Sequence, residues 1–468
     1  MMQLVSFQFL IFLPVMALIY FLVPAKLRYI WLFLISWGFY LSLDLRGFPI
    51  LLFTSLSVYI GARVMEKLEG AKRKTVLGIV VISNLIILAL SKYSGLTFLS
   101  AVGMSFFMFM AIGYMVDVYR GDLYAEKNFL VLSLFISFFP QITSGPIERA
   151  GHMLRQFRDP HNFSYDRMRD GLLQMMWGYF MKMVIADRCA IIVGTIYDNP
   201  VKYAGTATLI ASILYTFEIY CDFGGYSNIA IGCAKVLGFD LMKNFDAPYL
   251  SANVQEFWRR WHISLSSWFK DYVYIPLGGN RKGKVRKYIN ILIVFILSGI
   301  WHGANYTFAV WGLLHGIYQV AGHMLTPVRE KLCEIFKVKK ISFSHRLLKI
   351  IITFMIVNIA WIFFRVQDIK AAVYMVLHIF QPAPWFISKG TIYELGLDRP
   401  NVLLLFAAIG VLIGVDIANK YGICISEKIK TQGIWLRWLI YIAAVVLIVT
   451  CGIWGPGYDA AGFIYQNF

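Results

Sequence analysis

The amino-acid sequence predicts an all-α polytopic membrane protein, a single domain of about ten to twelve transmembrane helices with additional re-entrant or interfacial helices. Three observations carry this prediction. Of the 468 residues, 59% are hydrophobic and only 15% are charged, and the mean hydropathy is +0.64. Apolar runs close to the ~20 residues that cross a bilayer recur along the whole chain. Between residues 141 and 316, Gly, Pro, Asn, Asp, Arg and aromatic residues interrupt these runs.

The apolar runs give the expected helices in chain order. The first six fall at residues 4–23, 29–43, 47–62, 75–91, 97–116 and 128–139. The others fall at residues 171–185, 204–220, 288–301, 304–325, 347–364, 402–415 and 434–453. Several runs are shorter than a full span, so some are expected to be re-entrant or interfacial. The first run has no Lys or Arg before it and no small-residue cleavage site, which favours a retained helix over a removed signal peptide.

Sequence texture divides the domain into three parts. Residues 1–140 are regular apolar helices with few chemically active groups, typical of a supporting wall. Residues 141–316 form the irregular part, and irregular backbone is tolerated at membrane depth only where it is buried in protein or lines a watery cavity. This part is therefore expected to enclose the functional site. Residues 317–468 return to ordinary helices, with a Pro- and Gly-containing external loop at 381–400.

The net charge of +18 is concentrated in short loops. Basic residues gather at 63–74, 281–287, 337–340 and 420–430. Counting helices places these loops on one side and both termini opposite, as the positive-inside rule requires, which indicates a lipid bilayer and no nucleic-acid partner. A specific lipid site, or attraction of an anionic donor to loop 281–287, are alternatives. The six cysteines lack CxxC or Cys/His ligand spacing, so neither a disulfide framework nor a metal site is expected.

The motif WRRWH (258–262) opens an unusual stretch that runs to residue 276. Trp258, Trp261, Ser264, Leu265 and Trp268 recur at three- and four-residue spacings, which predicts one amphipathic helix at a membrane interface or cavity mouth. Arg259 and Asp271 exclude a lipid-spanning helix. The alternative is a simple interfacial belt of tryptophans with arginines that extend to the membrane surface.

His302 lies in the second motif, WHGAN (301–305). The preceding apolar run, 288–301, is roughly 21 Å long as a helix, shorter than the ~30 Å hydrocarbon core, which predicts that His302 lies within the depth of the membrane. A buried ionisable group in a membrane is a functional candidate, and a structural histidine between helices is the alternative. The structural interpretation is the stronger one for His315 and His323.

Glu218 and Asp222 are four residues apart and are expected on one helix face. Two carboxylates there require protonation or a cationic partner, such as Arg259 or Arg260. Both a proton relay and structural pairing fit this pattern.

Four motifs in order resemble the membrane-bound O-acyltransferase (MBOAT) family, in particular its bacterial alginate O-acetylase-like branch. They are ITSGPIER (142–149), YCDFGGYSNIAIG (220–232), residues 244–280, and SGIWHGANYTFAVWGLLHG (298–316). The resemblance implies a ring of tilted helices around a central tunnel, in which a cytosolic acyl donor and an extracellular acceptor reach the same histidine.

The resemblance also implies roles for individual residues. His302 matches the catalytic histidine, and His262 matches a second polar position that is histidine in members that modify polysaccharides. Substrate binding is assigned to Trp258, Arg259, Asp271, Asn305, Tyr226 and Asn228. Gly224 and Asn228 depart from the family pattern DFSGYSD, which leaves the fold assignment intact and weakens an acceptor-binding role for that segment.

The implied reaction is O-acetylation of a cell-surface polysaccharide. Acetyl-CoA or another acetyl thioester is the donor, no cofactor or metal is bound, and a secreted or membrane-anchored SGNH hydrolase-like acetyltransferase is the expected partner. Histidine suits a general base because its ordinary pKa is about 6.5. His262, Asn305 or backbone amides near Gly303 are candidates to stabilise the oxyanion.

Two alternatives have different chemistry. A related branch of the family transfers D-alanine to teichoic acid. A proton-coupled transporter could use Glu218, Asp222, Arg365 and the histidines as a relay, although no inverted repeat is visible.

Overall fold

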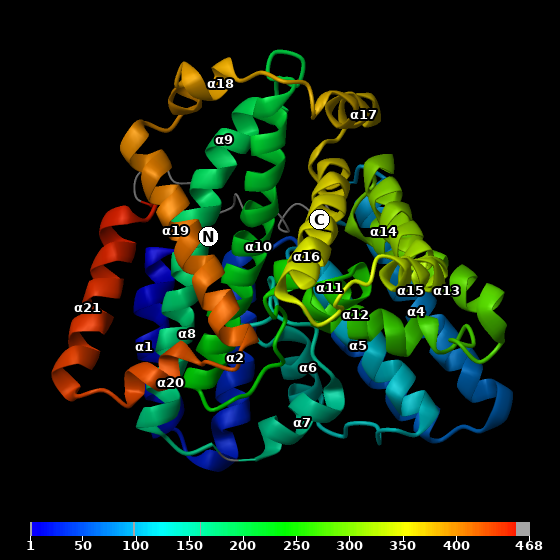
Figure 1. The fold of residues 1–468 in the computed structure, drawn as a ribbon. Helices are drawn as coiled ribbons and strands as arrows, with labels where there is room; N and C mark the ends of the chain where they lie inside the picture. Colours follow the sequence, from blue (N-terminus) through cyan, green and yellow to red (C-terminus); the bar gives the residue numbers. More distant parts are fainter. Residues whose placement is uncertain (1, 97–98, 160, 455–468) are drawn as a thin grey trace. The chain divides into compact units, whose positions relative to one another are not determined.

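The computed structural model describes residues 2–96, 99–159 and 161–454, and every regular element among them is a helix (Figure 1). The packing forms two compact units, which are described separately. Among the described residues, the first unit comprises 2–179 and 225–243, and the second comprises 180–224 and 244–454. The units therefore do not follow chain order. The three segments expected from sequence texture stay a prediction.

The first unit begins with α1 and ends with part of the long helix α10. Its helices are α1 (Phe7–Leu22), η1 (Ala25–Leu27), α2 (Arg28–Leu43), α3 (Phe48–Glu66), α4 (Gly70–Tyr93), α5 (Met104–Arg120), α6 (Phe129–Ser137), α7 (Ala150–Arg158), α8 (Tyr165–Tyr179) and the later part of α10 (Thr206–Val236). Helix α6 packs on α2, α3, α5 and α7 and is buried along most of its length. Its nine residues reach about 14 Å, too short to cross a bilayer.

Small residues bring α8 and α10 together within this unit. A Cβ at Gly171 would lie 2.6 Å from the carbonyl oxygen of Gly232, and a Cβ at Gly178 would lie 2.6 Å from that of Gly225. Close helix contact through small residues is the usual solution where lipid removes the hydrophobic drive for association.

The second unit holds both sequence motifs with histidine. Its helices are the π-helix η3 (Phe180–Ala186), α9 (Asp187–Tyr197), the first part of α10, η4 (Pro248–Leu250), α11 (Val254–Arg260), α12 (Ile263–Phe269), the π-helix η5 (Lys270–Tyr274), α13 (Gly283–His302), α14 (Tyr306–Met324), α15 (Thr326–Ile335), α16 (Phe343–Arg365), α17 (Ile369–His378), α18 (Trp385–Ser388), η6 (Thr391–Glu394), α19 (Arg399–Lys420), α20 (Ile425–Lys430) and α21 (Ile434–Cys451).

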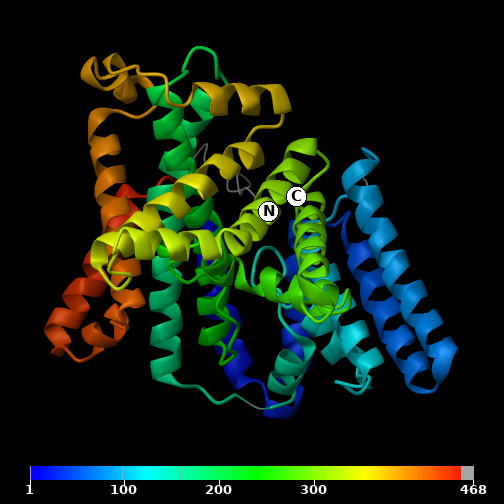
Figure 2. The ribbon, with the colours of Figure 1, turned by 45° about the vertical axis from the view of Figure 1, so that its right-hand side comes forward.

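Helices α13 and α14 form a tight antiparallel pair, visible side by side in Figures 1 and 2. Two glycines set their separation. A Cβ at Gly299 would lie 2.3 Å from the carbonyl oxygen of Phe308, and one at Gly312 would lie 2.2 Å from that of Phe295. Helix α14 packs in turn on α11 and α16. Helix α11 carries the first residues of WRRWH, and α13 ends at the histidine of WHGAN.

Six helices of the described residues are long and apolar enough to cross a membrane. They are α3, α4, α13, α16, α19 and α21. The membrane class is thus confirmed, while the ring of ten to twelve spans is not. The run expected at 97–116 begins with two residues outside the described part, and its helix α5 starts at Met104.

Candidate active site

His262 lies at a break between α11 and α12 and is 1% exposed. Its backbone is left-handed, with φ 43° and ψ 56°, which costs a residue with a Cβ about 1–2 kcal/mol. Backbone hydrogen bonds hold this conformation: the Ile263 amide donates to the Asn244 carbonyl at 2.9 Å, and the Asp246 amide donates to the Arg260 carbonyl at 2.9 Å. The segment around Asn244 therefore fixes where the imidazole lies.

The single helix predicted over residues 258–276 is wrong. The chain leaves α11 at Arg260, turns at His262, forms the seven residues of α12, and continues as a five-residue π-helix. The three- and four-residue spacing of apolar side chains continues across this break. The break itself depends on hydrogen bonds from the backbone around His262 to Asn244 and Asp246, and residue spacing within the segment does not predict such long-range contacts.

Asn244 determines the tautomer of His262. The Asn244 Oδ1 atom accepts from the Ser264 backbone amide (3.3 Å) and the Ser264 hydroxyl (2.9 Å), and lies 3.1 Å from His262 Nδ1. Because a backbone amide only donates, Oδ1 is the acceptor and His262 Nδ1 carries the proton. In the neutral imidazole, Nε2 then carries a lone pair, which is able to accept a hydrogen bond. Sequence reasoning missed Asn244, although it begins the motif at 244–280.

His302 ends α13 and is also 1% exposed. Its ring lies among aromatic rings, with centroid distances of 4.8 Å to Trp301, 5.0 Å to Trp311 and 5.1 Å to Phe364. The Trp301 ring also lies 6.5 Å from the His262 ring. One indole therefore lies near both imidazoles, which brings the two motifs together in one buried region.

The helix that ends at His302 is longer than the apolar run 288–301 predicts. Helix α13 begins at Gly283, not at residue 288, so its 20 residues reach about 30 Å. The basic residues Lys284, Arg286 and Lys287 therefore lie in the first turns of α13. A helix end tolerates them at the membrane because long Lys and Arg side chains can reach the membrane surface. Helix length alone thus does not place His302 at mid-depth.

His315 is a third buried imidazole on α14. The Trp258 indole N–H donates to its Nδ1 at 3.2 Å, which leaves the proton of the neutral ring on Nε2, the opposite tautomer to His262. Its ring lies 5.1 Å from that of Trp311, which also contacts His302. These contacts are consistent with the structural role expected for His315. The indole N–H of Trp258, a proposed substrate-binding residue, already donates to His315.

The other proposed binding residues differ in exposure. Arg259 and Asn305 are exposed, and Asn305 is the residue before the first turn of α14. Asp271 is half-buried on η5. In the first unit, Tyr226 is buried and lines a small cavity with Thr143 and Ser144, while the half-buried Asn228 accepts from Gln174 Nε2 at 3.3 Å.

The predicted cationic partner of Asp222 exists but is a different residue. Lys182 Nζ lies 2.6 Å from Asp222 and 2.8 Å from Asp187, and Lys182 is almost fully buried. Arg260, proposed for this role, pairs with Asp246 at 3.0 Å and Glu256 at 3.1 Å. The π-helix that carries Lys182 could not be read from residue spacing. Buried opposite charges of this kind are stable only when paired.

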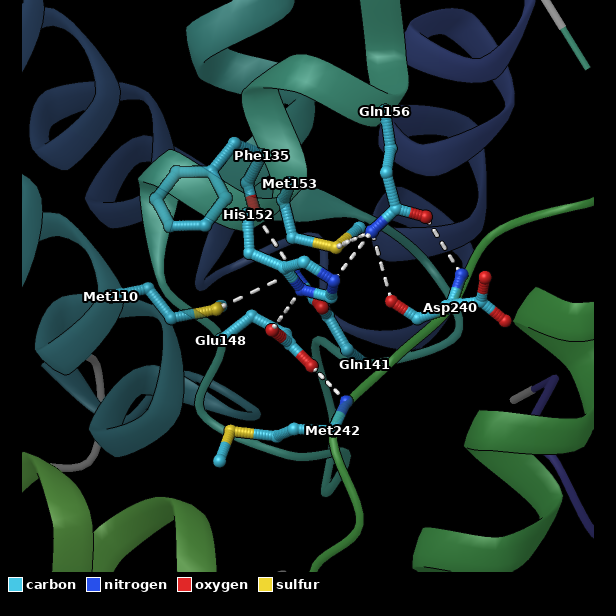
Figure 3. A network of polar contacts seen from close by, with 9 residues as sticks. All are labelled: Met110, Phe135, Gln141, Glu148, His152, Met153, Gln156, Asp240 and Met242. Carbon is cyan, nitrogen blue, oxygen red and sulfur yellow. Dashed lines mark hydrogen bonds and ion pairs between the residues drawn. The ribbon is translucent and has the colours of Figure 1, made fainter. Parts of the chain in front are cut away.

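The motif ITSGPIER contributes a separate polar network in the first unit (Figure 3). The buried Glu148 lies 3.1 Å from His152 Nδ1 and also accepts from the Met242 backbone amide. Gln156 then makes two hydrogen bonds to the backbone of Asp240, at 2.8 Å and 3.0 Å. The hydrogen bond to Glu148 raises the pKa of His152. This network ties α7 to the chain that follows α10.

Helices and site together define a multi-pass membrane protein with buried imidazoles suited to proton transfer. The sequence pattern of MBOAT, the membrane-bound O-acyltransferase family, matches residues 125–365. A probable alginate O-acetylase of Azotobacter vinelandii is 33% identical over 430 residues, covering 86% of this chain and 82% of the relative. A peptidoglycan O-acetyltransferase of Helicobacter pylori is 32% identical over 77% of this chain and 76% of its own length.

Another relative, which matches a smaller part of the chain, is named for a different acyl group. A teichoic acid D-alanyltransferase of Streptococcus thermophilus is 31% identical over 47% of this chain and 56% of its own length. The chain belongs to the membrane-bound O-acyltransferase family, and it is an O-acyltransferase of the cell membrane.

Proposed function

We propose that the protein transfers an acetyl group from a cytosolic acetyl thioester, acetyl-CoA or another, to hydroxyl groups of an extracytoplasmic polysaccharide. Transfer is direct or passes through an SGNH hydrolase-like acetyltransferase partner. The names of the Azotobacter and Helicobacter relatives support a polysaccharide acceptor. The proposal includes the ring of ten to twelve helices and the central tunnel, which give the donor and the acceptor access from opposite sides.

The observation that carries the proposal is the pair of buried imidazoles near Trp301. His302 acts as the general base: it removes the proton of the hydroxyl group as the oxygen attacks the thioester carbonyl. The carbon–sulfur bond then breaks, and the same proton goes to the thiolate that leaves. His262 orients the hydroxyl group through the lone pair on Nε2, because Asn244 keeps the ring proton on Nδ1.

His302→Ala tests this role. The variant is expected to lose about 10²–10⁴-fold in turnover, the usual contribution of a general base, with near wild-type expression and detergent stability. The measurement is acetyl transfer from a labelled acetyl thioester to polysaccharide in vesicles that contain the purified protein. His323→Ala, on the less buried end of α14, is the matched control and is expected to retain activity.

Two results would reject the proposal. Retention of more than about a tenth of wild-type turnover by His302→Ala contradicts the general-base role. Transfer of a D-alanyl group in place of acetyl, or flux of a solute with no acyl transfer, contradicts the substrate assignment.

A further inference from the structure

A cavity of about 280 Å³ lies in the first unit at the corner between α1 and α2. None of the residues assigned to acyl transfer lines it. Its charged and hydroxyl-bearing lining residues include Lys26, Arg28, Tyr29, Glu126, Arg158 and Asp159. At ~30 Å³ per water molecule, this volume holds about nine waters, enough for a phosphate group with its ester substituents.

Arg28 supplies a positive charge that no carboxylate neutralises among the described residues. Its guanidinium donates to three backbone carbonyls, those of Val23 at 3.0 Å, Phe21 at 3.1 Å and His161 at 2.5 Å. It also lies over the Tyr20 ring, 5.3 Å from the centroid. All these partners are neutral, so they fix the guanidinium in the wall of the cavity without cancelling its charge.

The remaining charges leave the cavity with an excess of positive charge. Arg158 forms an ion pair with the buried Glu126, so these two charges largely cancel. Lys26 is exposed on the short 3₁₀ helix η1 before α2. The two positive charges of Lys26 and Arg28 exceed the one negative charge of Asp159. The cavity therefore favours an anion.

Exposed apolar residues neighbour the segment 25–29 that lines the cavity. Leu22 and Leu27, which flank the corner, are 74% and 50% exposed, and Phe163 is 56% exposed against the Phe21 ring at 5.4 Å. Helices α1 and α2 each contribute 16 mostly apolar residues that meet at this corner, so the charges lie where the apolar surface ends. Charge beside exposed apolar surface matches an amphiphile at a membrane interface.

We propose that this cavity binds the phosphate group of an anionic phospholipid, whose acyl chains lie along the exposed apolar residues of α1 and α2. A free phosphate, or the phosphates of a soluble thioester donor, share the recognised group. The exposed apolar residues near the lining segment favour the lipid, because a soluble anion would gain nothing from Leu22, Leu27 and Phe163.

The test measures lipid binding by the purified full chain in detergent. Native mass spectrometry follows a titration with phosphatidylglycerol, and with phosphatidylcholine of the same chain length. Phosphatidylglycerol is expected to bind more tightly, and Lys26→Ala is expected to weaken its binding about fivefold, the effect of ~1 kcal/mol per cation near a membrane surface. Lys67→Ala removes another exposed lysine, at the end of α3, and is expected to change nothing.

A second variant changes binding in the opposite direction. Glu126→Gln removes the partner of Arg158 and adds one net positive charge, so phosphatidylglycerol is expected to bind more tightly. A general loss of structure would weaken binding in both variants. Equal binding of the two lipids, or equal effects of Lys26→Ala and Lys67→Ala, would overturn the proposal. Displacement of the lipid by inorganic phosphate or acetyl-CoA at similar concentration would assign the cavity to a soluble anion.

Discussion

At the residue scale, the two histidines of the candidate site differ in their surroundings. His262 has a polar support: Asn244 and Ser264 hold its Nδ1 side and set its tautomer. His302 lies among the rings of Trp301, Trp311 and Phe364. The neutral His262 presents a lone pair, which suits orientation of a hydroxyl group better than stabilisation of an oxyanion, because an oxyanion needs a donor.

Substitution by amides separates the two roles. His262→Gln is expected to retain measurable turnover, because its carbonyl oxygen can take the place of Nε2 as an acceptor, and His262→Asn is expected to retain less. His302→Asn is expected to lose about 10²–10⁴-fold, because an amide cannot act as a base near neutral pH. All three variants are assayed with the same thioester donor. Equal and complete loss in all three would contradict this division of roles.

At the scale of elements, the spacing of α13 and α14 depends on glycine. Gly312→Ala places a Cβ against the Phe295 carbonyl oxygen, a backbone atom that a side-chain rotation cannot move. We expect a loss of about 1–3 kcal/mol in stability, the usual cost of overpacking, and reduced turnover because α14 carries Trp311 and His315.

The matched control is Gly322→Ala on the same helix, where a Cβ would meet nothing within 4 Å. This substitution is expected to leave stability unchanged or to raise it by up to about 1 kcal/mol, the helix preference of alanine over glycine. Thermal unfolding in detergent measures both variants. Similar melting temperatures for the two would show that the helices can separate freely at Gly312.

At the scale of the whole molecule, the distribution of basic loops predicts the orientation in the membrane. The basic segment 281–287, which includes the start of α13, is expected in the cytosol, and segment 381–400 is expected outside. In a background with Cys333 and Cys424 replaced by serine, Lys284→Cys is expected to resist an impermeant thiol reagent in intact cells and to react after permeabilisation. Lys389→Cys, also exposed, is expected to react in both conditions. Labelling of Lys284→Cys in intact cells would reverse the orientation.

The sequence by itself determined the membrane class, the family and most helix positions, because apolar runs and long contiguous motifs are local properties of the chain. It also identified His262 and His302, since an imidazole is conspicuous among apolar residues. Local patterns failed where distant segments decide the backbone. The expected helix over 258–276 breaks at His262. The backbone groups on either side, the Arg260 carbonyl and the Ile263 amide, form hydrogen bonds with Asp246 and Asn244 instead of within a helix.

Only the tertiary structure decided the partners of the buried polar groups. Asp222 pairs with Lys182, 40 residues earlier in the chain, because the π-helix η3 brings that lysine to α10. Trp258 donates to His315, and Asn244 sets the tautomer of His262. Burial removes water as a partner, so a polar group that is left unpaired loses stability and most buried polar groups bond within the fold. Which group it finds depends on how the helices pack, and residue spacing along the chain does not carry that information.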